Sequence, residues 1–219
     1  PEGLNVGQAR AAALPCRRLL AVGTDMAVGK MSACLSLLEA AQRSGIPARF
    51  VGTGQAGILI SGEGVALDAV RVDYAAGAIE AAVLRAADGL PEQGLVLVEG
   101  QGSLCHPAST ATLPLLRGTQ PTALLLVHRA GQQTIDRLPQ IPLPSLEAIV
   151  ATTEALASWA RPEAAGPPAK VAAVALNTAR LDEAQAREEV ERIRQTLGLP
   201  CTDPIRWGSE PLLRALVDC

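Results

Sequence analysis

The stretch GTDMAVGKMS, residues 23–32, has the residue types and spacing of a loop that binds phosphate. Such a loop offers phosphate oxygens a series of backbone N–H groups, the N-terminus of a helix and a lysine ammonium. The usual pattern places Ser or Thr directly after the Gly-Lys pair, because that hydroxyl helps to hold Mg²⁺. Met31 stands at this position, so the sequence predicts phosphate binding without this metal ligand. The predicted phosphate contacts in the loop are Thr24, Asp25, Val28, Gly29, Lys30, Met31 and Ser32.

Two further polar stretches follow apolar runs, TGQAG at residues 53–57 and EGQGSLCHP at residues 99–107. Their glycines free the backbone so that N–H groups can converge on an anion, and their side chains add hydrogen-bond donors. We predict that they line a substrate pocket, although both stretches could instead be tight turns. The predicted substrate contacts here are Thr53, Gly54, Gln55, Gln101, Gly102 and Ser103.

Single side chains near other predicted strand ends carry charge or can transfer a proton. His128 and Asp73 are predicted to contact substrate, yet a buried histidine at the core edge and a cap for the following helix are comparably good interpretations. The cations available for carboxylates are Lys30, Arg49 and Arg129. The sequence does not divide these cations between substrate and cofactor.

The hydrophobic pattern predicts the elements that must position these residues. Short apolar runs bounded by turn residues predict buried parallel strands at 18–22, 48–51, 95–98, 123–128 and 171–176. Amphipathic spacing predicts helices at 31–43, 75–87 and 182–197, and a loop at 139–144 leads to a further helix capped by Ser145. The alternation predicts an α/β fold, a P-loop NTPase-like parallel sheet with helices on both faces. Ligands of such sheets bind beyond the carboxyl ends of the strands, where the polar stretches lie.

Composition excludes several classes of partner. A chain of 219 residues predicts one sizeable domain, and its 48% hydrophobic but 2% aromatic content predicts a core of Ala, Leu and Val. The net charge of −3, with scattered basic residues, predicts no nucleic-acid or membrane partner. Because no apolar run is long enough to span a membrane and no signal peptide is evident, we expect a cytoplasmic protein. The five cysteines form no C-x-x-C pair and are expected to be reduced.

The loop GTDMAVGK resembles the GTD-x-x-VGKT loop of dethiobiotin synthetase and its P-loop relatives. LVLVEGQGS, residues 95–103, is similar to the segment of that enzyme whose glutamate assists the metal. Arg49 falls where the enzyme has a phosphate-contacting lysine, and Asn177 resembles its adenine-reading asparagine. The resemblance implies an adenine nucleotide at Lys30, Arg49 and Asn177, with ATP and Mg²⁺ as the ligand in an ATP-dependent ligase or kinase.

A second resemblance covers almost the whole chain. GTDMAVGKMS, TGQAGILISGEG, EGQGSLCHP, IPLPSLE and ALNTARLDEAQA resemble, in this order, the C-terminal P-loop domain of the DgcN family. Characterised members of that family are D-glutamate N-acetyltransferases, and methionine is usual there after the Gly-Lys pair. The resemblance implies a junction segment at residues 1–16, a P-loop domain at residues 17–219 and an upstream N-terminal domain outside this chain.

The resemblance to the DgcN family implies transfer of an acetyl group from acetyl-CoA to the amine of D-glutamate or a similar acidic amino acid. Amine attack on a thioester requires a base, and Glu99 and His106 are the predicted catalytic residues. No metal ligand is predicted, and a homodimer is left open. A ligase of the dethiobiotin-synthetase type and a nucleotide-binding module without chemistry of its own remain the alternatives.

Overall fold

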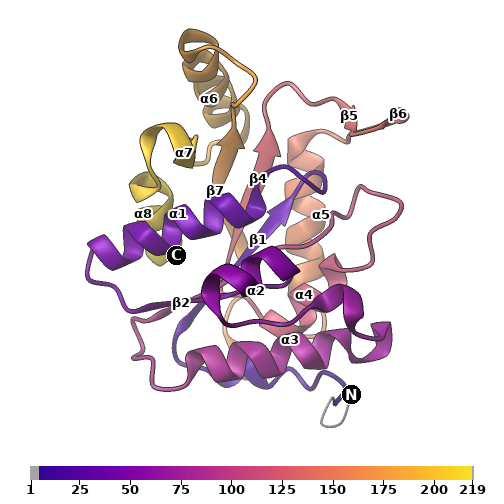
Figure 1. Cartoon of the computed structure of the whole chain (residues 1–219), viewed down its shortest axis with the longest axis vertical. Helices are drawn as coiled ribbons and strands as arrows, with labels where there is room; N and C mark the ends of the chain where they lie inside the picture. Colours follow the sequence, from indigo (N-terminus) through magenta and orange to yellow (C-terminus); the bar gives the residue numbers. More distant parts are fainter. Residues whose placement is uncertain (1–4, 219) are drawn as a thin grey trace.

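The computed structural model describes residues 5–218, and its centre is a six-stranded parallel sheet in the order β2-β3-β1-β4-β7-β8 (Figure 1). Both β3 and β4 pair with β1, which therefore lies inside the sheet. A separate two-stranded antiparallel hairpin projects beyond the sheet. The strands are β1 (Arg17–Gly23), β2 (Ala48–Val51), β3 (Leu95–Val98), β4 (Ala123–Arg129), β5 (Thr134–Ile135), β6 (Leu138–Pro142), β7 (Lys170–Asn177) and β8 (Cys201–Thr202).

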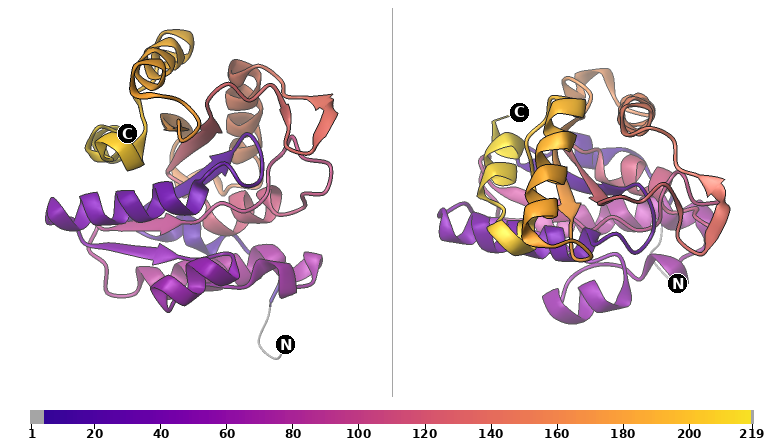
Figure 2. Two further views of the ribbon diagram at one scale, coloured as in Figure 1. Left: turned by 45° about the horizontal axis from the view of Figure 1, so that its top comes forward. Right: turned by 90° about the horizontal axis from the view of Figure 1, so that it is seen from above.

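Helices cover both faces of the sheet because side chains alternate along each strand. In β1, Leu20 and Val22 pack into one apolar cluster, whereas Leu19 and Ala21 pack into the other. Figure 2 shows α1 and α3 on opposite sides of the strands. One face carries α1 (Lys30–Arg43) and α8 (Glu210–Val217), and the other carries α3 (Val72–Ala87), α4 (Thr112–Thr119), α5 (Leu146–Ser158) and α6 (Glu183–Leu197). The remaining helices are α2 (Gln55–Ser61), α7 (Pro204–Trp207) and the 3-10 turns η1 (Arg10–Ala13), η2 (Leu67–Ala69) and η3 (Glu163–Ala165).

The structure confirms the predicted parallel α/β sheet, all five predicted strands and the three predicted helices. Ser145 caps α5 as predicted, with its hydroxyl accepting a hydrogen bond from Ala148 N–H. The predicted loop at 139–144 is wrong over most of its length, because residues 139–142 belong to β6. Prolines are tolerated in this strand because it lies in an isolated hairpin with few ladder hydrogen bonds. Asp73 does not cap α3, since the helix begins at Val72 and Asp73 lies within its first turn.

The segment before β1 packs on α3 through one fully buried carboxylate. Glu80 accepts hydrogen bonds from the N–H groups of Gln8 and Arg10 and from the Arg10 guanidinium. A carboxylate this deeply buried is tolerated because both of its oxygens accept hydrogen bonds and one of the donors is a cation. Residues 5–16 of the expected junction are therefore fastened to the domain, and residues 1–4 lie outside the described part.

Two expectations about the chain's environment concern its helices and cysteines. Within residues 5–218, no helix has both the length and the apolar character needed to cross a bilayer. Cys16, Cys34, Cys105 and Cys201 form no disulfide in the structure, and Cys219 lies outside the described residues.

Candidate functional site

The predicted polar stretches meet at the carboxyl edge of the sheet because β1 lies between β3 and β4. The loop of residues 23–30 follows β1, Glu99 follows β3, and His128 lies near the end of β4 (Figure 1). The chain leaves β1 toward β2 on one side of the sheet and later continues from β4 toward β7 on the other. Such a change of direction is where open α/β sheets bind ligands.

Lys30 is the first residue of α1, and its side chain lies over the loop that precedes it. Its ammonium donates hydrogen bonds to the carbonyls of Asp25 and Met26, each at 2.8 Å. Burial lowers the pKa of Lys30 to about 8, an effect that the negative charges of Asp25 and Glu99 partly oppose. Gly29 caps the helix at a φ of 111°, which only glycine adopts readily. The lysine ammonium and the N-terminus of α1 therefore both lie at the loop of residues 23–30.

Asp25 is buried, and both of its carboxylate oxygens are occupied by protein donors. Oδ1 accepts the N–H of Met26, and Oδ2 accepts the Gln132 amide at 2.6 Å and the Asp136 N–H at 2.7 Å. Burial alone would raise the pKa of this carboxyl, but the hydrogen bonds together hold the pKa below its ordinary value. Asp25 therefore ties the loop to the β5–β6 hairpin.

A cavity of about 620 Å³, called here the P-loop cavity, opens beside Lys30 and Glu99. Glu99 is buried, and its Oε2 accepts hydrogen bonds from the N–H groups of Thr53 and Gly54. Gly57 approaches Glu99 so closely that a Cβ there would collide with the carboxylate. These contacts orient Glu99 at the cavity wall. The predicted site residues that border this cavity are Gly29, Lys30, Met31, Ser32, Glu99, Gln101 and Gly102.

A second cavity, of about 270 Å³ and called here the Asn177 cavity, lies on the other side of the α1 N-terminus. Asn177 donates its side-chain N–H to the Val28 carbonyl at 2.9 Å, and its Oδ1 accepts the Ala179 N–H. Gly29 and Ser32 border both cavities, so the start of α1 separates them. The other residues around the Asn177 cavity are Val28, Ala33, Val127, Ala175, Leu176, Ala179, Asp203, Pro204, Ile205 and Arg206.

His128 does not border either of these cavities. It is buried, and its Nδ1 lies 2.9 Å from the Thr24 hydroxyl. Burial lowers the pKa of His128 to about 4, although the charge of Glu189 opposes this effect. A neutral imidazole at pH 7 cannot serve as a cationic anchor for a substrate carboxylate. Its position fits the core-edge interpretation, with one ring nitrogen bracing the phosphate-binding loop.

His106 is half-buried in the β3–α4 connection, where its Nδ1 accepts the Ala108 N–H. It does not border the P-loop cavity, which Ala108 reaches. Ser103 is also outside the cavity, and its hydroxyl donates to the Thr24 carbonyl. The contacts of His106 and Ser103 therefore stabilise the β3–α4 connection and the loop after β1. Proton transfer by His106 stays a prediction.

Three predicted contacts lie on elements around the site without bordering either cavity. Arg49 is exposed on β2, before the carboxyl end of that strand. Asp73 is exposed in the first turn of α3, although Val72 and Ala75 beside it border the P-loop cavity. Gln55 is the first residue of α2, so TGQAG leads into a helix and is more than a turn. The structure brings none of these three side chains to Lys30.

Some cavity residues were absent from the sequence prediction. Asp68 borders the P-loop cavity, and Asp203 and Arg206 border the Asn177 cavity. Asp203 caps α7 by accepting the N–H groups of Ile205 and Arg206. The sequence Asp-Pro is a helix-start signal that could have located this cap. No comparable local signal marks Asp68.

A loop with a buried lysine, placed between a central parallel strand and the helix that follows it, defines the class of P-loop proteins. A family model described as a domain of unknown function, the DUF1611_C P-loop domain, matches residues 5–213. The chain belongs to this DUF1611 family.

Two curated relatives, from Pseudoalteromonas sp and Tritonibacter scottomollicae, bear the name D-glutamate N-acetyltransferase. Each is 39% identical over 201 residues, which are 91% of this chain and 58% of the relative. The chain therefore spans 58% of the length of the curated relatives it matches.

Solved structures agree with the fold. A crystal structure of a DUF1611 family protein from Anabaena variabilis has a TM-score of 0.93 and 48% identity, covering 100% of this chain and 62% of that one. The structure of chloroplast FtsY from Physcomitrella patens has a TM-score of 0.51 at 15% identity, covering 98% of this chain and 67% of that one. The likeness to FtsY concerns the fold alone.

Proposed function

We propose that this domain binds acetyl-CoA and takes part in acetyl transfer to the amine of D-glutamate or a similar acidic amino acid. The observation that carries the proposal is the pair of cavities that meet at Gly29 and Ser32, with Lys30 and Glu99 on one side and Asn177 on the other. The name borne by the two relatives supplies the reaction class and the acceptor.

The two cavities fit the parts of an adenine-bearing coenzyme. The Asn177 cavity is largely apolar and borders backbone and amide groups, which suits a flat base. Phosphates would lie at the N-terminus of α1, where N–H groups and the Lys30 ammonium offer positive charge. The larger P-loop cavity would then hold the acyl end and the acceptor.

Met31 gives this loop a different metal chemistry from that of ATP-splitting relatives. Its apolar side chain borders the P-loop cavity at the position where a Ser or Thr hydroxyl would hold Mg²⁺. Acetyl-CoA carries phosphates but transfers none, so binding it needs a positive field and no metal held in strict geometry. The proposed ligand therefore requires no hydroxyl at position 31.

Glu99 is the residue best placed to accept a proton in the P-loop cavity. Its Oε2 is held by two N–H groups, and within residues 5–218 its Oε1 accepts no hydrogen bond. We propose that Glu99 takes a proton from the acceptor ammonium. The free amine then attacks the thioester carbonyl, the carbon–sulfur bond breaks, and the leaving thiolate takes up the proton that the new amide nitrogen loses. Gln101, whose buried Oε1 has no partner among the described residues, is the second polar group proposed to orient the acceptor.

Calorimetric titration of the 219-residue chain with acetyl-CoA and with ATP, each in EDTA and in Mg²⁺, tests this proposal. We expect acetyl-CoA to bind equally in both conditions, and we expect thiol release to depend on added D-glutamate. In Met31→Thr, acetyl-CoA affinity should stay within about twofold while ATP binding becomes more dependent on Mg²⁺, because the new hydroxyl supplies a metal ligand.

The alternative is an ATP-dependent ligase or kinase, for which Lys30 and Glu99 are also suitable residues. ADP formation that requires Mg²⁺ and a carboxylate substrate, without binding of acetyl-CoA, would establish this alternative. Binding of nucleotide without any turnover would instead favour a module that has no chemistry of its own.

A further inference from the structure

The charges around the two cavities do not match the charge of the proposed ligands. Within the described part of the chain, the charged residues that border the P-loop cavity are Lys30, Asp68 and Glu99, one cation against two carboxylates. The Asn177 cavity adds one cation and one carboxylate, Arg206 and Asp203, and the Arg206 guanidinium donates to the carbonyls of Thr178 and Leu181. Coenzyme phosphates and acceptor carboxylates are both strongly anionic, so further cations nearby would stabilise either ligand.

A third cavity supplies that charge. It has a volume of about 380 Å³ and is called here the arginine cavity. Among the described residues, three arginines (Arg129, Arg137 and Arg180) and one acid (Asp136) border it. Three positive charges against one negative charge leave a local excess of two. Gln132, Gln133 and Thr134 also border it and add polar side chains.

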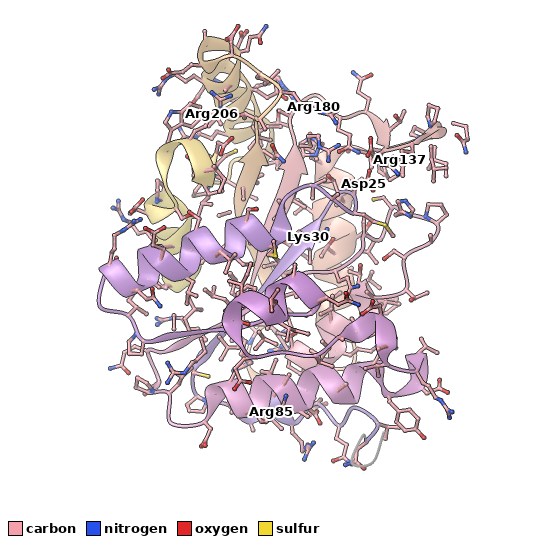
Figure 3. The ribbon with its side chains drawn as sticks, viewed as in Figure 1. Asp25, Lys30, Arg85, Arg137, Arg180 and Arg206 are labelled. Carbon is pink, nitrogen blue, oxygen red and sulfur yellow. The ribbon has the colours of Figure 1, made fainter. Side chains whose placement is uncertain are left out.

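Two of the three guanidiniums are available to a ligand. In residues 5–218, the side chains of Arg137 and Arg180 form no hydrogen bond or ion pair, and both are exposed. Figure 3 shows them on the same side of the molecule as Asp25, on the hairpin and beyond the end of β7. Arg137 has a φ of 63°, a conformation that Gly or Asn would adopt at lower cost. The turn of the hairpin thus holds Arg137 in a left-handed conformation that arginine adopts only at a cost in free energy.

The arginine cavity is joined to the phosphate-binding loop by direct contacts. Arg129 donates to the Ala27 carbonyl at 2.6 Å, while Asp136 N–H donates to Asp25. Arg180 follows Asn177, which borders the Asn177 cavity, by three residues along the chain. Ala27 also borders the P-loop cavity, so Arg129 connects that cavity to the arginine cavity.

We propose that the arginine cavity is a binding site for a compact oxyanion, either a phosphate monoester or a carboxylate. Guanidinium groups recognise both through paired N–H donors. Two ligands of the proposed function carry such a group: the coenzyme has a 3′-phosphate beside its adenine, and the acceptor has a side-chain carboxylate. The choice between these sources rests on the proposed function, whereas the oxyanion site itself does not.

The test uses small probes that differ by one anionic group. Adenosine 3′,5′-bisphosphate is compared with adenosine 5′-monophosphate, and glutarate with butyrate, by calorimetry on the unmodified chain, Arg137→Gln and Arg180→Gln. Each substitution should weaken binding of one of the two probes that carry two anionic groups, the bisphosphate or glutarate, about five- to tenfold. The affinity of the matching probe with one anionic group, adenosine 5′-monophosphate or butyrate, should change less than twofold. Arg85→Gln removes an exposed arginine from the distant end of α3 and should change neither pair.

Loss confined to the bisphosphate assigns the cavity to the coenzyme, and loss confined to glutarate assigns it to the acceptor. If the bisphosphate and glutarate both bind the two variants as they bind the unmodified chain, the oxyanion site is wrong. A chain that does not bind acetyl-CoA but shows the probe differences contradicts the proposed function and leaves the oxyanion site supported.

Discussion

The Asn177 amide donates a hydrogen bond to the Val28 carbonyl at 2.9 Å, joining the end of β7 to a loop 149 residues earlier in the chain. The same side chain borders the Asn177 cavity, and its Oδ1 accepts the Ala179 N–H. Asn177 therefore shapes the loop while one amide hydrogen remains for a ligand. A substitution there affects both the contact with Val28 and the wall of the Asn177 cavity.

Asn177→Ala is expected to weaken acetyl-CoA binding about tenfold, since a net hydrogen bond contributes about 1 kcal/mol and the loop also loses its brace. Discrimination between adenine and guanine nucleotides should fall as well. Calorimetry with ADP and GDP measures both effects. Unchanged affinity and selectivity in a variant with an unchanged unfolding midpoint would remove Asn177 from the ligand site.

Affinity for phosphate-bearing ligands should fall as the pH rises through about 8, because the buried Lys30 has a pKa of about 8 and loses its charge there. Once Lys30 titrates, the association constant should decrease by up to about tenfold per pH unit. Titrations with acetyl-CoA between pH 7 and 9.5 measure this slope. Lys30→Arg provides the control, since a guanidinium remains charged over the whole range and should flatten the profile. The same slope in both proteins would assign the pH dependence to another group.

Acid should destabilise the fold through His128. Its pKa is about 4 in the folded chain, against an ordinary value near 6.5, because burial disfavours the imidazolium. Between these values the unfolded chain binds a proton that the folded chain does not, so stability falls as the pH drops from about 6.5 to 4. The loss reaches at most about 3 kcal/mol.

His128→Gln should remove this component, so the urea midpoint should depend less on pH between 7 and 4.5. His106→Gln is the matched control, since that histidine is half-buried and the chain has only these two. We expect it to keep the steep acid loss. An unchanged pH slope in His128→Gln, measured against this control, would show that His128 is not the titrating group.

Glu80→Gln is expected to lower the free energy of unfolding by about 2 to 4 kcal/mol. The fully buried carboxylate accepts three hydrogen bonds from Gln8 and Arg10. In glutamine one of the two oxygens becomes an NH₂ group, which is a donor and cannot accept a hydrogen bond from the donor that it faces. Denaturant unfolding measures the loss. Glu188→Gln makes the same chemical change at an exposed position of α6 and should stay within about 0.5 kcal/mol. Equal effects of the two changes would show that the hydrogen bonds from Gln8 and Arg10 to Glu80 do not stabilise the fold.

Long periodic segments were predictable because their pattern repeats over many residues. The amphipathic spacing of α1 and α6 repeats over about four turns of helix, whereas the apolar runs of β1, β3, β4 and β7 are identified as strands by their short length and the turn residues around them. Two-residue strands such as β8 and short helices such as α2 offer no such repeat. They form because neighbouring elements pair with them or pack on them, as β7 does with β8.

The sequence by itself determined the order of the five predicted strands and of the longer helices, the loop with Lys30, and the presence of Glu99 after a later strand. Local periodicity and loop chemistry are written in consecutive residues, so these features need no knowledge of distant contacts. Only the tertiary structure decided that His128 is buried beside Thr24, that Asn177 holds Val28, and that three arginines from two separate segments border one cavity. Burial, pKa and side-chain partners depend on which segments pack together across more than a hundred residues, and the spacing of residues along the chain does not contain that information.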